Sequence, residues 1–418
     1  MVLKCYVITV KGIVRNMSFH NILAPMRKQF VALLCLLPLS VAAQDNMNMQ
    51  MAASSSHTVE LGASASFDSH GRLWVVDAAD KHVRLRYSDD FGTTFSAPVV
   101  VNAQPEQIYD RSENRPKLAI GTHGELYVTW SQSLAKPWTG FVRFARSMDD
   151  GAHFSVPVTV HVDRSQIGHT FDALAVDGKG RVVVAWIDKR DAETASAQGK
   201  PYLGAALYYS WSNDQGRTFA PERKLVDHSC DCCRIELTRT TKGDIAAFFR
   251  SIFGDNIRDH AYAVLHADAQ PDKIERATFD NWQIAACPRQ GPSLAIAADG
   301  TRHAVWYVAK DTPTIWYGQL DPGHPPHHAQ AIASAGASHA DVAVDGSTVW
   351  VTWNQVDAQG YTLMLRRSSD AGTHFDNPKA LATTASSAGS PQLLLWHDHA
   401  YVAWNTAEGF RLLTVGEH

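Results

Sequence analysis

The sequence predicts an all-β chain in which a four-stranded unit repeats around a closed ring, that is, a β-propeller. Three observations lead to this prediction: a self-similar unit of about 50 residues, short strands rich in β-branched and aromatic residues, and no sustained helical period. The chain has 418 residues, which is more than one ordinary core holds. Either several domains or one large ring must account for this length, and the repeat favours the ring.

The repeated unit opens with a short strand ending in Asp-x-x-Gly, as at Asp68 to Gly71, and continues with an apolar second strand that often ends in Trp. Seven second strands are recognisable, at residues 73–77, 126–130, 182–186, 245–249, 304–306, 349–353 and 401–404. Their spacing is typical of a propeller blade of four strands. We favour seven blades, with six as the alternative if the fourth or last unit is an irregular insert.

The last unit, from Gln392 to Val415, lacks a fourth strand. Residues 57–61 precede the first unit and could supply it. Such an exchange between the two ends would close the ring and remove an exposed sheet edge. The propeller is therefore expected to span residues 58–418.

Four units carry the octamer Ser-x-Asp-x-Gly-x-x-Phe after the third strand, beginning at Ser88, Ser147, Ser212 and Ser368. Each octamer is expected to lock a hairpin turn. The Asp side chain accepts hydrogen bonds from turn N–H groups, the Gly adopts a backbone conformation unfavourable for other residues, and the Phe covers the blade edge.

These octamers match the Asp-box motif, so residues 60–415 resemble the sialidase, or bacterial neuraminidase repeat (BNR), superfamily of β-propellers. In that family the turns lie at the blade periphery, away from the active site. The sequence Cys230-Asp231-Cys232-Cys233 with a later Cys287-Pro288 also resembles a group of uncharacterised exported bacterial Asp-box proteins.

The N-terminal region indicates export. An apolar run at 30–39 follows Arg27 and Lys28, and small residues at 41–43 predict signal-peptide cleavage before Gln44. Residues 1–43 are thus an expected signal peptide with an over-long start, translation beginning at Met26 or Met17. A Met-rich segment follows at 44–57. We expect a periplasmic or secreted protein without a membrane span.

The charge balance excludes a global nucleic-acid-binding surface. Lys and Arg number 38 and Asp and Glu 42, giving a formal net charge of −4. The expected partner is a small molecule or a glycan. Most tryptophans end second strands and are expected in the core, whereas Trp138 lies in a loop and is a better candidate for stacking on a ligand.

Ligands of a propeller bind at one end of the central channel, where loops entering the first strands meet loops joining second and third strands. Polar residues of these loops are the candidate ligand-binding residues: Arg115, Arg234, Arg250, Arg258, Arg289, His169 and His339. The alternative is that Arg and Asp side chains in these loops pair to tie adjacent blades together.

The family resemblance implies three arginines on a substrate carboxylate, a Tyr nucleophile activated by Glu, and an Asp acid/base. The candidates are Asp110, Asp172 and Asp259 for the acid/base and Tyr307 for the nucleophile. The Arg-Ile-Pro sequence of the family is absent, and no Glu obviously pairs with Tyr307. We therefore favour a propeller that binds an acidic or glycan ligand, either non-catalytic or a divergent glycosidase. A retaining exo-α-sialidase is the second interpretation.

The four cysteines left after signal cleavage cluster at equivalent positions in two consecutive units. In an exported protein they predict disulfides, such as a bridge from Cys232 or Cys233 to Cys287. The competing interpretation is a copper or zinc site formed by Cys230, Cys232, Cys233 and His228. Met47, Met49 and Met51 add thioethers that suit copper. A periplasmic copper- or zinc-handling protein is the third interpretation.

Overall fold

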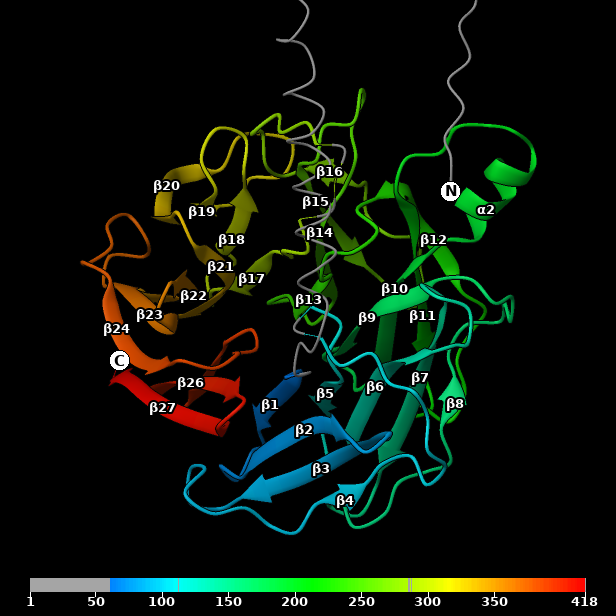
Figure 1. Cartoon of the computed structure of the whole chain (residues 1–418), viewed down its shortest axis with the longest axis horizontal. Coiled ribbons are helices and arrows are strands. Elements are labelled where there is room, and N and C mark those ends of the chain that lie inside the picture. The colour runs from blue at the N-terminus through cyan, green and yellow to red at the C-terminus, as the bar shows by residue number, and fades with distance from the viewer. Residues whose placement is uncertain (1–60, 112, 285, 287, 418) are drawn as a thin grey trace, which may run out of the picture. The chain divides into compact units, whose positions relative to one another are not determined.

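The computed structural model describes residues 61–417, apart from 112, 285 and 287. The expected signal peptide, the Met-rich segment and all but Leu61 of the proposed closing strand lie outside the described residues. The described part forms seven antiparallel sheets arranged around a central axis (Figure 1). The predicted seven-bladed, all-β propeller is confirmed.

Each sheet is a meander whose strands pair in chain order. Blades one to three contain β1 (Ala63–Phe67), β2 (Leu73–Ala79), β3 (His82–Ser88) and β4 (Val99–Val100); β5 (Lys117–Ile120), β6 (Leu126–Ser133), β7 (Gly140–Ser147) and β8 (Val158–Thr159); and β9 (His169–Val176), β10 (Val182–Asp188), β11 (Ala205–Ser212) and β12 (Arg223–Ser229).

Blades four to seven contain β13 (Glu236–Arg239), β14 (Ile245–Arg250), β15 (His260–Leu265) and β16 (Glu275–Arg276); β17 (Ser293–Ile296), β18 (Arg302–Val308), β19 (Thr314–Gln319) and β20 (His327–Ser334); β21 (Ala337–Asp345), β22 (Thr348–Asp357), β23 (Gly360–Ser368) and β24 (Lys379–Thr384); and β25 (Gln392–Trp396), β26 (His399–Thr406) and β27 (Gly409–Glu417). The seventh sheet has three described strands.

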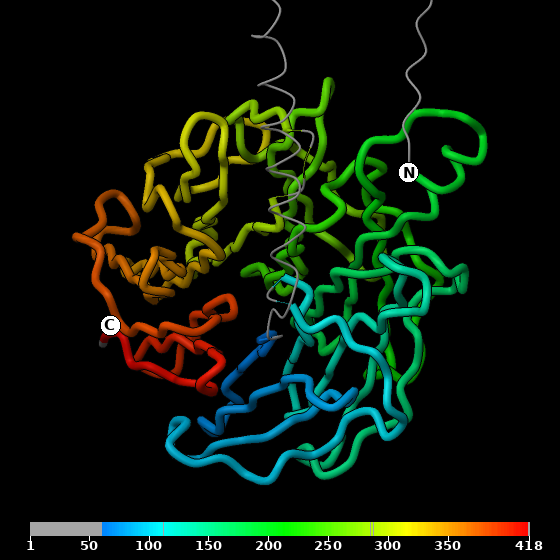
Figure 2. Tube along the Cα trace, in the orientation of Figure 1, coloured from blue at the N-terminus to red at the C-terminus, as the bar shows by residue number. Residues whose placement is uncertain are grey.

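The first and last blades pack against each other, as Figure 2 shows for the blue and red ends of the trace. The rings of Phe67 and Tyr401 are 5.3 Å apart, and the N–H of Ala65 donates to Oε1 of Gln392 at 3.0 Å. The carbonyl oxygen of Leu61 accepts a hydrogen bond from Asn405. The described residues thus bring the two ends of the ring together by side-chain packing.

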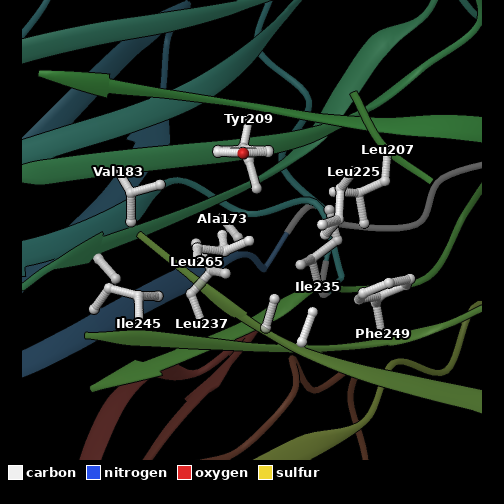
Figure 3. Close-up of a cluster of buried hydrophobic side chains, with 14 of the residues drawn as sticks. Ala173, Val183, Leu207, Tyr209, Leu225, Ile235, Leu237, Ile245, Phe249 and Leu265 are labelled. Atoms are coloured by element: carbon white, nitrogen blue, oxygen red, sulfur yellow. The ribbon is translucent and has the colours of Figure 1, made fainter. Parts of the chain in front are cut away.

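The core lies between neighbouring blades. Figure 3 shows one such cluster, in which Val183 and Tyr209 of blade three meet Ile245 and Phe249 of blade four, all at most 1% exposed. Full burial of such a side chain stabilises the fold by about 1.5–3 kcal/mol. The tryptophans at second-strand ends are buried as predicted, among them Trp130, Trp186, Trp353 and Trp404.

The four octamer turns show the expected hydrogen bonds. In the first, Oδ1 of Asp90 accepts from the N–H of Thr94 at 2.8 Å, and Oγ of Ser88 accepts from the N–H of Gly92 at 2.8 Å. The turns at Asp149, Asp214 and Asp370 repeat this pattern. Each turn also contacts the preceding blade: a Cβ at Gly216, whose φ is +74°, would lie 2.2 Å from the Phe144 ring.

One described helix, α2 (Arg190–Ala197), lies in the connection between β10 and β11, where the sequence predicted a loop. Asp191 and Glu193 occupy its first turn, where negative charge favours the helix dipole. Within the described residues, no helix has the length and apolar character needed to cross a membrane.

Candidate functional site at the channel mouth

Loops from four blades meet around the carboxylate of Glu113. This residue precedes β5, and its Oε2 accepts hydrogen bonds from the N–H groups of Arg234 (3.1 Å) and Gly291 (2.8 Å), which precede β13 and β17. Its Oε1 accepts from Nδ1 of His339, in β21, at 2.8 Å. We call Glu113, Arg234 and His339 the hub. The hub joins blade two to blades four, five and six.

The surroundings of the hub carboxylate favour its ionised form. Burial alone would raise the pKa of Glu113, but the charge of Arg234 and the hydrogen bonds from His339 and Gly291 hold this pKa well below its usual range. The sequence did not single out Glu113, because 226 residues separate it from His339. Its position between Asp110 and Arg115, in a predicted entry loop, was the available signal.

Three of the predicted arginines donate to backbone carbonyl oxygens of other blades. Arg234 donates to Pro292 and Ala340 at 3.0 and 3.1 Å. Arg250 donates to Tyr307 at 2.7 Å, and Arg115 donates to Ser390 at 3.0 Å. All three side chains are at most 6% exposed. These contacts match the alternative that the arginines tie blades together.

The other two predicted arginines are placed differently. Nε of Arg258 donates to Oδ1 of Asn256 at 2.9 Å, and this side chain is 8% exposed. Arg289 is exposed, and its guanidinium carbon lies 5.9 Å from the centre of the Trp138 ring. That distance is within the range of a cation–π contact.

Trp138 and Arg289 are exposed at the mouth, and we call them the rim together with the half-buried Lys189. Trp138 is 67% exposed, whereas the tryptophans of the second strands are buried. A Cβ at Gly168 would meet both the Trp138 carbonyl oxygen and the Lys189 side chain, and Nζ of Lys189 lies 3.3 Å from Asp231. The rim thus includes Trp138 of blade two and Lys189 of blade three, and Lys189 contacts the turn before blade four. Arg289 lies in the segment that enters blade five.

The rim is connected to the hub through Gln290, which follows Arg289. Oε1 of Gln290 accepts from the N–H of His339 at 2.8 Å. Trp138, Arg289 and His339 have φ angles of +63°, +50° and +53°. Such backbone conformations are uncommon for residues other than glycine and cluster at functional sites.

The predicted acid/base residues are buried, and Asp172 and Asp259 are hydrogen-bonded to other residues of the fold. Asp172 accepts hydrogen bonds from the hydroxyls of Thr129 and Ser131, both at 2.7 Å. Asp259 pairs with Arg276 and accepts from the N–H of Asn281. Asp110 is 4% exposed. Their catalytic roles remain predictions.

Tyr307, the predicted nucleophile, is half-buried beside Trp282, with the two ring centres 6.0 Å apart. Burial raises its pKa, which disfavours a phenolate nucleophile. Among the described residues, no carboxylate is hydrogen-bonded to its hydroxyl. The Tyr–Glu pair of a sialidase is therefore not formed by described side chains around Tyr307.

Two charged residues, Lys117 and Glu236, lie on the innermost strands β5 and β13. Burial lowers the pKa of Lys117 to about 8 despite the nearby Asp172. Burial raises the pKa of Glu236 to about 8, opposed by the charges of Arg234 and Arg115. Neither residue was singled out in the sequence, because charged side chains on short apolar strands show no motif.

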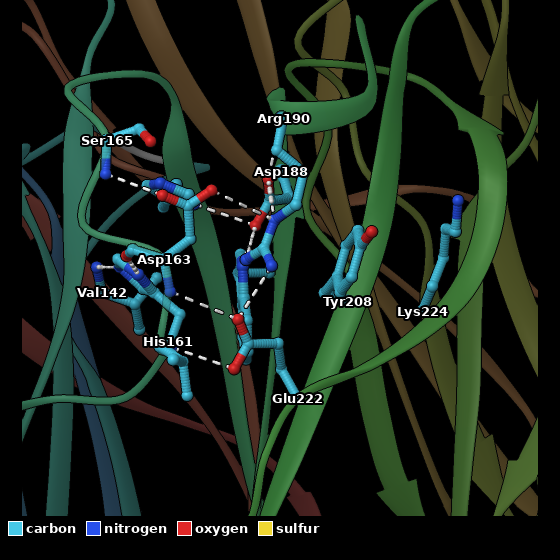
Figure 4. Close-up of polar contacts among 12 residues, drawn as sticks. Val142, His161, Asp163, Ser165, Asp188, Arg190, Tyr208, Glu222 and Lys224 are labelled. Carbon is cyan, nitrogen blue, oxygen red and sulfur yellow. Dashed lines mark hydrogen bonds and ion pairs between the residues drawn. The ribbon is translucent and has the colours of Figure 1, made fainter. Parts of the chain in front are cut away.

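His169 belongs to a buried network beside the mouth. Its Nδ1 lies 2.9 Å from Oδ2 of Asp188, and its ring stacks on His161 at 4.0 Å. Figure 4 shows Arg190 linking Asp188 to Glu222, at 2.7 and 2.8 Å. His169 is 0% exposed. This network anchors the start of α2, and it keeps the His169 side chain buried rather than exposed at the rim.

The cysteine turn joins β12 to β13, next to the hub. Cys230 and Cys233 are free and buried, with their Sγ atoms 3.1 Å apart, whereas Cys232 is disulfide-bonded. Cys287, the bridge partner predicted from the sequence, lies outside the described residues. The three sulfur atoms lie within 4.8 Å of one another, a spacing that suits a metal. However, a disulfide sulfur provides no thiolate ligand. His228 is directed away, with Nδ1 3.0 Å from the Leu203 carbonyl oxygen.

No protein-family model and no curated protein matches this chain. Among solved structures, an ulvan lyase of a new polysaccharide lyase family, bound to -[GlcA(1-4)Rha3S]-, matches with TM-score 0.53 and 11% identity over 86% of this chain and 95% of that chain. The polysaccharide lyase Uly1 matches with TM-score 0.53 and 8% identity over 86% and 92%.

The NanB sialidase of Streptococcus pneumoniae matches with TM-score 0.43 and 10% identity, over 74% of this chain and 69% of that chain. At these identities the likenesses concern the fold. The likeness to the two polysaccharide lyases, each with TM-score 0.53, supports the fold of the structure.

Proposed function

We propose that this propeller binds an acidic glycan across its channel mouth. The observation that carries the proposal is the exposed ring of Trp138 with the guanidinium of Arg289 over it. A tryptophan face provides a platform for a sugar ring, and a neighbouring arginine provides bidentate hydrogen bonds to a carboxylate or sulfate.

The charges near the rim support an acidic ligand. Arg289 is exposed and has no carboxylate partner among the described residues. Lys189 is paired with Asp231, and both side chains are 34% exposed. The rim thus has an excess of positive charge that can attract an anion.

Within this proposal, His339 is the group available to exchange a proton with the glycan. Its side chain is 23% exposed, while its Nδ1 is held by the ionised Glu113. A carboxylate on one imidazole nitrogen fixes the tautomer and leaves Nε2 to act as a base. Glycan binding itself does not depend on this proton transfer.

A retaining exo-α-sialidase has less support. Such an enzyme needs three guanidinium groups on the substrate carboxylate and a Tyr–Glu pair. Here Arg115, Arg234 and Arg250 donate to carbonyl oxygens of the fold, as described above. We also propose export to the periplasm or medium, from the signal-like residues 1–43.

The proposal is tested by calorimetric titration of the purified protein. The acidic probe is an oligosaccharide of the -[GlcA(1-4)Rha3S]- repeat, and the control is a neutral oligosaccharide of equal length. We expect binding to the acidic probe alone, weakened by added salt. Equal binding of the neutral sugar would contradict the proposal. A parallel assay with a fluorogenic sialoside tests the sialidase interpretation. Hydrolysis of the sialoside would support that interpretation.

A further inference from the structure

The turn between β12 and β13 holds two free thiols in contact. The Sγ atoms of Cys230 and Cys233 are 3.1 Å apart, and their side chains are 1% and 2% exposed. Cys232 is disulfide-bonded, so the two free thiols have each other as the available pair. We propose that Cys230 and Cys233 form a redox centre in which a small peroxide converts the two thiols into a disulfide.

The fold holds both ends of this turn. The N–H of Cys230 donates to the carbonyl oxygen of Arg250 at 3.0 Å, and the N–H of Arg234 donates to Glu113. These bonds fix the residues on either side of the two sulfur atoms. Closing a disulfide from 3.1 Å requires the sulfur atoms to approach by only about 1 Å. The spacing Cys-x-x-Cys permits such a bond within one turn.

The surroundings give the two thiols different roles. The hydrogen bond from Cys233 lowers the pKa of Cys230, with help from the charges of Arg250 and Arg258 and against the effect of burial. Burial and the neighbouring Cys230 raise the pKa of Cys233. Cys230 is therefore the attacking thiolate, because the thiolate is the nucleophilic form. Cys233 is the thiol that completes the disulfide.

The reaction balances with one peroxide. The Cys230 thiolate attacks one oxygen of hydrogen peroxide, the O–O bond breaks, and hydroxide leaves, giving Cys230 sulfenic acid. The Cys233 sulfur then attacks the Cys230 sulfur, the S–O bond breaks, and the S–S bond forms. Two thiols and one hydrogen peroxide thus give one disulfide and two waters. The thiols are oxidised by two electrons and the peroxide is reduced.

Burial selects the size of the oxidant. The three cysteines pack together against Phe171, and Cys232 is the most exposed at 7%. A peroxide is small enough to enter such a site, whereas a bulky disulfide reagent is excluded while the turn stays folded. The centre lies next to Arg234, whose N–H contacts Glu113. The disulfide would therefore form one residue from Arg234 of the hub. This inference does not rest on the glycan proposal.

The test counts alkylatable thiols in the full-length protein. Native protein is treated with hydrogen peroxide, denatured without reductant, and alkylated, and the tryptic peptide 225–234, which holds all three cysteines, is examined by mass spectrometry. We expect two alkylated cysteines before treatment. After treatment we expect none, with the loss of two hydrogens and no added oxygen. Protein isolated with this bond already closed also supports the pairing.

Two variants separate the roles. In Cys233→Ser, peroxide should leave Cys230 as a sulfenic acid that dimedone labels. In Cys230→Ser, the same dose should leave Cys233 alkylatable. Two unchanged thiols in the wild type after peroxide, or oxidation beyond sulfenic acid without a disulfide, would overturn the proposal. So would copper or zinc bound in stoichiometric amount and released on alkylation of these cysteines.

Discussion

The hub of Glu113, Arg234 and His339 and the rim of Trp138, Lys189 and Arg289 lie at the same mouth, yet they use polar side chains in opposite ways. In the hub, the buried side chains of Glu113 and Arg234 are bonded to backbone groups of other blades, and His339 is bonded to Glu113. In the rim, Trp138 and Arg289 are exposed, and the Arg289 guanidinium lies 5.9 Å from the centre of the Trp138 ring. The difference teaches that a cationic residue at a propeller mouth can be structural or ligand-facing, and that exposure separates the two.

The largest expected effect is on stability, through the hub. Arg234→Met removes the charge beside Glu113 and leaves the carbonyl oxygens of Pro292 and Ala340 without their donor. Removing one partner of a buried charged pair costs about 3–5 kcal/mol. Urea unfolding should show a loss of this size. The matched rim variant, Arg289→Met, should change the unfolding free energy by at most about 0.5 kcal/mol. Equal losses in the two variants would erase the distinction between hub and rim.

A smaller effect is expected at the outer turns, which serve as a third reference region. Gly216→Ala places a Cβ 2.2 Å from the Phe144 ring of the preceding blade. Its control is Gly199→Ala, since Gly199 has a similar φ of +65° but no atom within 4 Å of a new Cβ. The clash should cost about 1–3 kcal/mol more at Gly216, measured by urea unfolding. If the unfolding free energy falls equally in the two variants, contacts of the turns with the preceding blade do not stabilise the fold.

Glu236, on the innermost strand of blade four, gives a pH dependence of the unfolding free energy. Burial raises the pKa of Glu236 from 4.5 to about 8, so between these values the folded state binds more protons than the unfolded state. Stability contributed by Glu236 is therefore present below pH 4.5 and is lost as pH rises towards 8. Unfolding free energies at pH 5, 6.5 and 8 should fall less in Glu236→Gln than in the wild type. If the unfolding free energies of the wild type and of Glu236→Gln change equally with pH, Glu236 is not the titrating group.

The repeat predicted the fold because each blade reproduces the same local chemistry. In the turn at Asp90, the side chains of Ser88 and Asp90 accept hydrogen bonds from N–H groups four residues further along the chain. The structure of this turn therefore follows from the octamer alone. The hub could not be predicted in this way. Glu113 and His339 are 226 residues apart, and no local pattern distinguishes an arginine that bonds a carbonyl oxygen from one that meets a ligand. The loop position of Trp138 did indicate its exposure.

The central claim is that the rim binds an acidic glycan, and affinity measurements on rim variants test it most directly. Calorimetry with the -[GlcA(1-4)Rha3S]- oligosaccharide should compare the wild type, Trp138→Ala, Arg289→Ala and the control Arg217→Ala, an exposed arginine on an outer turn. Each rim variant should bind about tenfold more weakly, corresponding to ~1.4 kcal/mol, with its unfolding midpoint unchanged. Arg217→Ala should bind like the wild type. Undiminished binding by both rim variants, or an equal loss in Arg217→Ala, would contradict the account.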